Sequence, residues 1–130
     1  MLLASKTPIV VADAAIAKKS LLMTTEDVKK RLSGLHAAAP LLVSDFEAWM
    51  GKHSDIAQQV TGSSTHWPIW DEATTAYLLG FATAETKPRP VLRDDLIFDL
   101  SKPEGTIKWV TEIDSPKLWD DLVECLERPH

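Results

Sequence analysis

The feature that most restricts the fold is a change in the spacing of apolar residues near residue 90. Before this point apolar side chains recur every three or four residues, which is the period of an amphipathic helix. Between residues 95 and 113 apolar and polar side chains alternate instead, around a turn at Lys102–Gly105 that holds a proline and a glycine. The pattern predicts an α+β fold, mainly helical, with about four helices and one β-hairpin near residues 95–113.

Local end signals delimit the predicted helices. The first begins near Thr25 and ends at Gly34 or, at the latest, at Pro40. The second covers 45–60, follows a capping box that begins at Ser44, has possible breaks at Gly51 and Ser54, and stops at Gly62. The third runs from Asp71 to about residue 84, and the fourth follows Asp114, with Pro116 in its first turn.

The segment 1–22 is predicted to be separate from a single globular domain that covers 23–130. The run that starts at Met23 resembles a natural start, because a methionine is followed directly by a helix-capping sequence. We therefore expect residues 1–22 to be an N-terminal extension that adds little to the fold. The alternative is a short docked helix, because Val11, Ala14 and Lys18 lie at helical spacing.

Charge and composition narrow the classes of function. The formal net charge is −5, and the basic clusters are short, so phosphate backbones and anionic lipid surfaces are unfavourable partners. We expect neither nucleic-acid nor membrane binding. Cys125 is the only cysteine, so no intrachain disulfide or cysteine-based zinc site can form. It is predicted to be buried or half-buried, and a reducing, cytoplasmic location suits it, although a disulfide-free periplasmic protein has the same composition.

One segment gathers residues that could perform catalysis. Between residues 66 and 72 the chain places His66, two tryptophans, Asp71 and Glu72, and a histidine beside a carboxylate can act as a general base. The competing interpretation is structural, with Asp71 capping a helix. His53 could bind a metal only with further ligands, so we expect no metal site and no cofactor.

Acidic residues dominate the last third of the chain. From Asp94 onward there are ten acids against four bases. This composition fits a solvated surface, but it also fits a surface that attracts a basic protein, with exposed aromatic side chains as anchors. The residues that we predict to contact such a partner are Trp67, Asp94, Asp95, Glu112, Asp120, Asp121 and Glu124.

Three functions remain open from the sequence. The first is a non-enzymatic, acidic protein-binding module, most concretely an inhibitor such as a bacterial immunity protein that neutralises a toxin by masking its basic surface. The second is a small hydrolase or transferase that uses His66 with Asp71 or Glu72. The third is an accessory subunit of a larger complex, in which the hairpin edge pairs with another chain. Self-association into a homo-oligomer is compatible with each of them.

Overall fold

The computed structural model describes residues 6–35, 38–95 and 97–128 and has a mixed α+β architecture. Its helices are α1 (Ala14–Ser20), α2 (Thr25–Leu32), α3 (Ala39–Lys52), α4 (Ser54–Thr61), α5 (Glu72–Leu78) and α6 (Ser115–Glu127). Its strands are β1 (Val10–Val11), β2 (Leu22–Met23), β3 (Trp67–Pro68), β4 (Ala82–Pro88), β5 (Val91–Leu92), β6 (Phe98–Asp99) and β7 (Thr106–Ile113). The α+β class is confirmed, but the described residues form six helices, so the expected number of about four is wrong.

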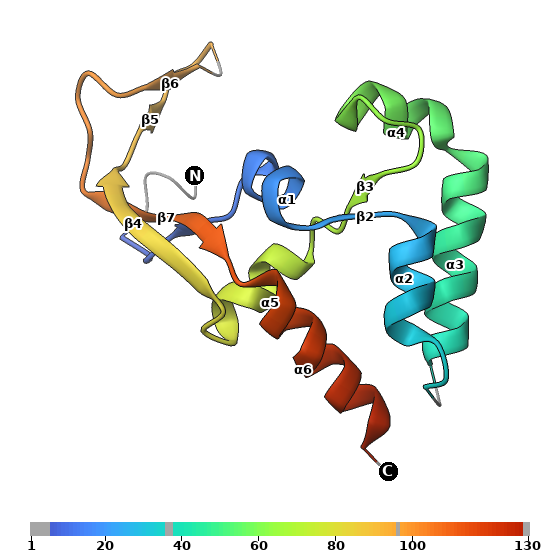
Figure 1. The fold of residues 1–130 in the computed structure, drawn as a ribbon. Helices are drawn as coiled ribbons and strands as arrows, with labels where there is room; N and C mark the ends of the chain where they lie inside the picture. The colour runs from blue at the N-terminus through green and yellow to red at the C-terminus, as the bar shows by residue number, and fades with distance from the viewer. Residues whose placement is uncertain (1–5, 36–37, 96, 129–130) are drawn as a thin grey trace.

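The single hairpin predicted near residues 95–113 is also wrong. Strand β7 lies at the centre of a three-stranded sheet, where it pairs antiparallel with β4 and parallel with β1. The segment expected as the first hairpin strand contributes only β6, which pairs with β5 in a separate two-stranded arm, and Leu96 lies outside the described residues. Figure 1 shows this arm projecting from one end of the sheet. A further short ribbon, β2–β3, joins the sheet side of the molecule to the helices α2, α3 and α4.

Gly80 explains why the helical pattern of the sequence failed to predict strand β4. The predicted helix from Asp71 to residue 84 ends at Leu78, because Gly80 adopts a left-handed φ of 79°. The amide of Phe81 then donates to the carbonyl of Ala76, and the amide of Gly80 donates to that of Tyr77. This is a Schellman end, which turns the chain out of the helix and into β4. Asp71 precedes the helix without a capping side-chain hydrogen bond.

The α3 boundary shows a second correction. Pro40 was expected to end the preceding helix at the latest, and α2 does end before it, at Leu32. Pro40 also lies in the first turn of α3, where its missing amide costs nothing, so α3 begins before the predicted start at residue 45. Ser44 is therefore inside the helix and forms no capping box. The predicted break after Gly51 is confirmed, because α3 ends at Lys52 and α4 begins at Ser54. The predicted stop at Gly62 is confirmed by its left-handed φ of 80°.

Two apolar clusters form the core. The first joins α1 and α5 to the inner face of the sheet, and its buried members are Ala17, Leu21, Ala73, Ala76 and Leu118. The second joins α2 and α3 to α6, and its buried members are Met23, Val28, Leu32, Ala39 and Trp119. Helix α6 contributes one buried residue to each cluster, Leu118 to the first and Trp119 to the second, and so connects them.

The described part of the segment 1–22 takes part in this core. Ile16 and Ala17 of α1 are buried, and Leu21, which follows α1, is among the largest fully buried side chains. Strand β1 supplies the parallel edge of the sheet. None of the helices that the structure describes combines the length and the apolar character needed to span a bilayer.

Two adjacent leucines test how much this N-terminal segment stabilises the domain. We expect Leu21→Ala to lower the free energy of unfolding by about 2–5 kcal/mol, because it leaves a cavity in the first cluster. Leu22→Ala is the matched control: Leu22 is 37% exposed whereas Leu21 is 2% exposed, so the control should cost well under half as much. Urea unfolding followed by tryptophan fluorescence measures both. Losses of well under 1 kcal/mol for both variants would show that the segment is an extension without a packing role.

Candidate partner-binding site

A pocket lies at the seam between the two apolar clusters, where α5 faces α6. Its volume is about 170 Å³, and its apolar lining includes Leu118 from the first cluster and Ile69, Trp119 and Leu122 from the second. A cavity of about 150 Å³ holds one benzene-sized group, so this pocket has room for part of one long side chain. The remaining lining residues are Leu21, Glu72, Thr75, Asp121 and Cys125.

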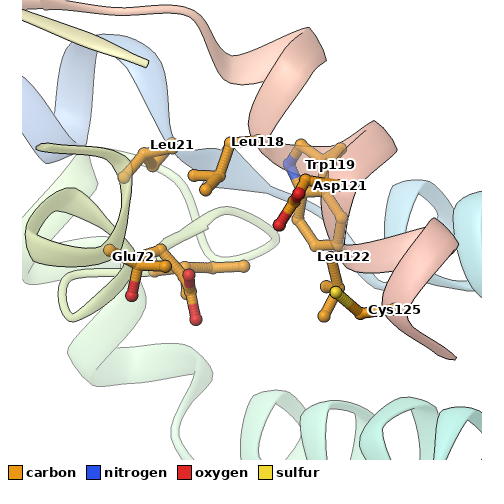
Figure 2. Close-up of a pocket in the computed structure, with 9 residues that line it drawn as sticks. Leu21, Glu72, Leu118, Trp119, Asp121, Leu122 and Cys125 are labelled. Carbon is orange, nitrogen blue, oxygen red and sulfur yellow. The ribbon is translucent and has the colours of Figure 1, made fainter. Parts of the chain in front are cut away.

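Two carboxylates border this pocket. Glu72 comes from the first turn of α5 and Asp121 from the middle of α6, and Figure 2 shows them on facing sides of the space between these helices. Neither carboxylate forms an ion pair with any residue that the structure describes. Asp120, the exposed neighbour of Asp121, likewise has none. The site therefore combines an apolar floor with two carboxylates that form no ion pair within the described residues. Asp121 still interacts with Arg128, whose pKa is raised first by the hydrogen bond and charge of Glu124 and to a smaller extent by the charge of Asp121.

The local sequence explains why α6 presents these acids. The Asp114 side chain accepts a hydrogen bond of 3.2 Å from the amide of Lys117 and caps the helix, and Pro116 occupies its first turn, as predicted. This hydrogen bond lowers the pKa of Asp114, because it favours the ionised carboxylate. With the helix fixed in this way, Leu118 and Trp119 point into the core, and the acids of the next turns are left toward solvent or the pocket. Cys125, predicted to be buried or half-buried, is exposed at the border of the pocket.

The predicted contact residues do not form one acidic face. Asp120, Asp121 and Glu124 lie together on α6, and Glu124 forms an ion pair of 2.8 Å with Arg128. Asp94 and Asp95 lie in the β5–β6 arm, at the other end of the molecule in Figure 1. These acids were predicted to contact one partner because they lie in the same third of the sequence. The fold places them on different elements.

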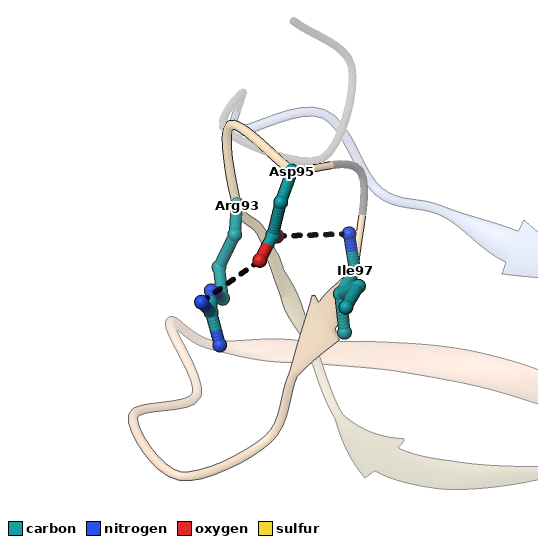
Figure 3. A network of polar contacts seen from close by, with 3 residues as sticks. All are labelled: Arg93, Asp95 and Ile97. Carbon is teal, nitrogen blue, oxygen red and sulfur yellow. Dashed lines mark hydrogen bonds and ion pairs between the residues drawn. The ribbon is translucent and has the colours of Figure 1, made fainter.

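The acids of the arm are partly neutralised within the arm itself. Asp95 accepts a hydrogen bond from the Ile97 amide at 3.3 Å and forms an ion pair with Arg93 at 2.8 Å, as Figure 3 shows. Glu112, at the end of β7, shares a shallow hollow with Lys19 and Lys117. Arg93 weakens the attraction of Asp95 for an external cation, whereas the ion pair of Lys117 is with Asp114.

Trp67 belongs to an aromatic cluster. Its ring centroid lies 4.1 Å from that of Trp49 and 5.9 Å from that of Trp70, and the second pair meets edge to face. Trp49 also contacts His53, with 5.0 Å between the ring centroids. These contacts attach α3 and the start of α4 to β3. They engage Trp67 within the chain and leave it only half-buried.

His66 has polar neighbours that the sequence did not indicate. Its Nδ1 atom lies 2.9 Å from the Ser63 hydroxyl and 3.1 Å from the Thr65 hydroxyl, whereas no hydrogen bond or ion pair joins it to Asp71 or Glu72 within the described residues. The acid whose pKa is affected by the charge of His66 is Asp27. The pKa of Asp27 is lowered, first by hydrogen bonds from Thr24 in the capping box of α2, and to a smaller extent by the charges of Arg31 and His66.

A metal centre is not assembled by this fold: within the described residues, no group of three or more His, Cys, Asp or Glu side chains is placed to hold an ion. His36 and His130 lie outside the described residues.

Comparisons with known proteins identify a similar fold. The chain matches no protein-family model, and no curated protein sequence matches it. Among solved structures it is similar to a plant nucleoside hydrolase, with a TM-score of 0.69 and 15% sequence identity. The likeness covers 98% of this chain and 44% of that enzyme, so the chain spans less than half of the enzyme's length. At this level of identity the likeness shows the fold alone.

Trp119 lines the pocket and is buried in the second cluster, so its removal tests the architecture. Its side chain is 7% exposed, and the guanidinium of Arg31 lies 5.2 Å from the ring centroid. We expect Trp119→Ala to lower the free energy of unfolding by about 3–5 kcal/mol. The control is Arg31→Ala, which removes the cation–π contact and the weaker charge interaction with Asp27 and should cost about 1 kcal/mol or less. A loss below about 1 kcal/mol for Trp119→Ala, measured by urea unfolding, would place this residue on the surface.

Proposed function

We propose that this chain is a non-enzymatic, acidic protein-binding module that masks a basic partner, most concretely an inhibitor such as a toxin-neutralising immunity protein. The observation that carries the proposal is the α5–α6 pocket, in which Glu72 and Asp121 border an apolar floor. A lysine or arginine side chain has the matching chemistry, because its aliphatic stem packs on apolar surface while its charged end pairs with carboxylates.

Electrostatics support the same assignment. The net charge of −5 gives long-range attraction for a basic protein, and attraction of this kind accelerates association. Asp120 and Glu124 lie next to the pocket on α6 and extend the negative charge beyond it. A partner that inserts one basic residue into the pocket meets further acids along the same helix. A cytoplasmic location fits such a role, and we propose it on the same grounds.

The test is capture of a basic protein from a lysate of the source organism, compared between two variants that remove equal charge. Glu72→Gln with Asp121→Asn removes the pocket carboxylates and should weaken capture at least about tenfold, or about 1.4 kcal/mol. Asp94→Asn with Asp95→Asn changes the arm and should leave capture unchanged. Quantitative mass spectrometry of the eluates measures both. Association with the captured protein should slow as salt is added.

Either of two results would contradict the proposal. The first is equal capture by both variants, which would place the contact outside the pocket. The second is an association rate that does not respond to salt, because charge attraction would then have no part in recognition.

A second candidate function, a small hydrolase, is favoured by one contact. The Ser63 hydroxyl and the His66 imidazole lie within hydrogen-bond distance, which is the arrangement of a serine nucleophile and its base. The solved structure that resembles this chain is itself a hydrolase that acts on nucleosides, by its name. In this alternative His66 acts with Ser63 in place of the expected Asp71 or Glu72.

Turnover of a panel of nucleosides and simple esters tests this alternative. If it is right, Ser63→Ala and His66→Ala should each reduce kcat/KM by at least about a hundredfold, because general base catalysis contributes that much or more. His53→Ala is the matched control, since His53 is half-buried but contacts Trp49 and no hydroxyl of this loop. The absence of turnover by the native chain, or turnover that survives both variants, would exclude the dyad.

A further inference from the structure

The outer edge of β4 carries a second interaction surface. β4 is the last strand of the sheet, whose order is β1-β7-β4, and Figure 1 shows it along the outer side with no strand beyond it. Thr83, Glu85, Thr86 and Pro88 are exposed. An exposed strand edge presents amide and carbonyl groups that can pair with another strand. Seven residues make this edge longer than any other edge strand that the structure describes.

The hydrogen bonds of Arg89 determine which groups of β4 point outward. Its amide donates to Gly105, and its carbonyl accepts from Glu104, so the backbone of Arg89 faces the β7 side. Backbone direction alternates along a strand. Lys87 and Glu85 therefore also face β7, whereas Pro88, Thr86 and Ala84 direct their backbone groups away from the sheet. Pro88 has no amide and so loses nothing on the outward side.

We propose that two copies of this chain associate by antiparallel pairing of β4 with β4, around a two-fold axis at Thr86. In this register Thr86 exchanges two backbone hydrogen bonds with its counterpart. Each Ala84 amide donates to the Pro88 carbonyl of the other copy. The three-stranded sheet of each copy then continues into a six-stranded sheet, and no intrachain hydrogen bond is lost.

The charges on β4 select this register over its neighbours. A two-fold axis at Thr86 places each Glu85 directly opposite Lys87 of the other copy. Two ion pairs can therefore form across the axis. An axis at Glu85 or at Lys87 would place like charges opposite each other. An axis at Ala84 would leave both charged side chains opposite uncharged residues, Thr83 and Phe81. The side chains of Glu85 and Lys87 are on one face, because they oppose Trp109 and Ile107 in β7.

Sedimentation equilibrium of the full chain, from about 1 µM to about 1 mM, tests the association. We expect a concentration-dependent dimer. Glu85→Lys creates two Lys–Lys contacts across the axis and should raise the dimer dissociation constant about tenfold or more. The double variant Glu85→Lys with Lys87→Glu restores two opposite pairs and should recover most of the affinity. A monomer over the whole range, or a dimer that Glu85→Lys leaves unchanged, would overturn the proposal.

Cysteine cross-linking tests the register of the proposed β4–β4 pairing directly. In a Cys125→Ser background, Thr86→Cys places two thiols across the axis, where paired Cα atoms lie about 5.5 Å apart, within the reach of a disulfide. Mild oxidation should therefore give a covalent dimer. Thr83→Cys is the matched control, because its counterpart lies several residues away along the paired strands and should not be cross-linked. Equal cross-linking of both variants would exclude this register.

Two measurements keep these results interpretable. Circular dichroism of each variant confirms that it folds, which is expected because the substituted side chains are exposed or half-buried. The pocket variant, Glu72→Gln with Asp121→Asn, should dimerise as the native chain does, because β4 and the α5–α6 pocket share no residues. Failure of self-association and failure of partner binding are thus separate outcomes.

Discussion

The architecture depends on the burial of two consecutive residues of α6. Leu118 packs with α1 and α5 beneath the sheet, and Trp119 packs with α2 and α3. Neighbouring positions on a helix point about 100° apart, so one helix can contribute to two different cores only if it lies along the boundary between them. Without α6, the first cluster would keep four buried members, of which three are alanines, and the second would keep Met23, Val28, Leu32 and Ala39.

This position of α6 also explains the pocket. The pocket lies where α5 faces α6, and Thr75, a short side chain of α5, is among the residues that line it. The floor of the pocket is apolar because it is the edge of both cores, whereas its border is acidic because the solvent side of α6 carries acids. The direction of α6 is in turn set by the strand before it. The Asp114 amide donates to the Phe81 carbonyl at 2.8 Å, which attaches the start of α6 to the start of β4.

Several features governed by neighbours in sequence could be predicted, although the helix end at Gly80 and the start of α3 at Pro40 were missed. Features governed by distant pairing could not be predicted. The start of α6 at Asp114 and Pro116, the break near His53 and the stop at Gly62 are all local signals, and the structure confirms them. The partner of β7 is different. Its alternating pattern predicts a strand, but the pairing of Thr106–Ile113 with Ala82–Pro88 depends on which strand can reach it in space. The sequence of β4 is weakly apolar, and its alanines fit a helix as well as a strand.

The candidate site also contains one residue that the sequence indicated and one that only the fold brings to it. Asp121 was expected to contact a partner, because acids cluster near it in sequence, whereas Glu72 was assigned to a catalytic role with His66. Only the fold brings Glu72 from α5 opposite Asp121 from α6. The sequence signal for Glu72 was its closeness to His66, at the start of the helix predicted from Asp71. That signal locates the residue on α5 and carries no information about what faces it.

The two proposed surfaces have consequences for each other. A two-fold dimer through β4 carries two α5–α6 pockets, each built within one copy. A partner with a single basic protrusion would then bind each copy independently, and its affinity would not depend on the concentration of this chain. A partner with two suitably spaced protrusions would engage both pockets, and the second contact would form at a high effective concentration. Comparing the affinity of native and Glu85→Lys chains for one captured partner distinguishes these cases, because only the second loses affinity when the dimer dissociates.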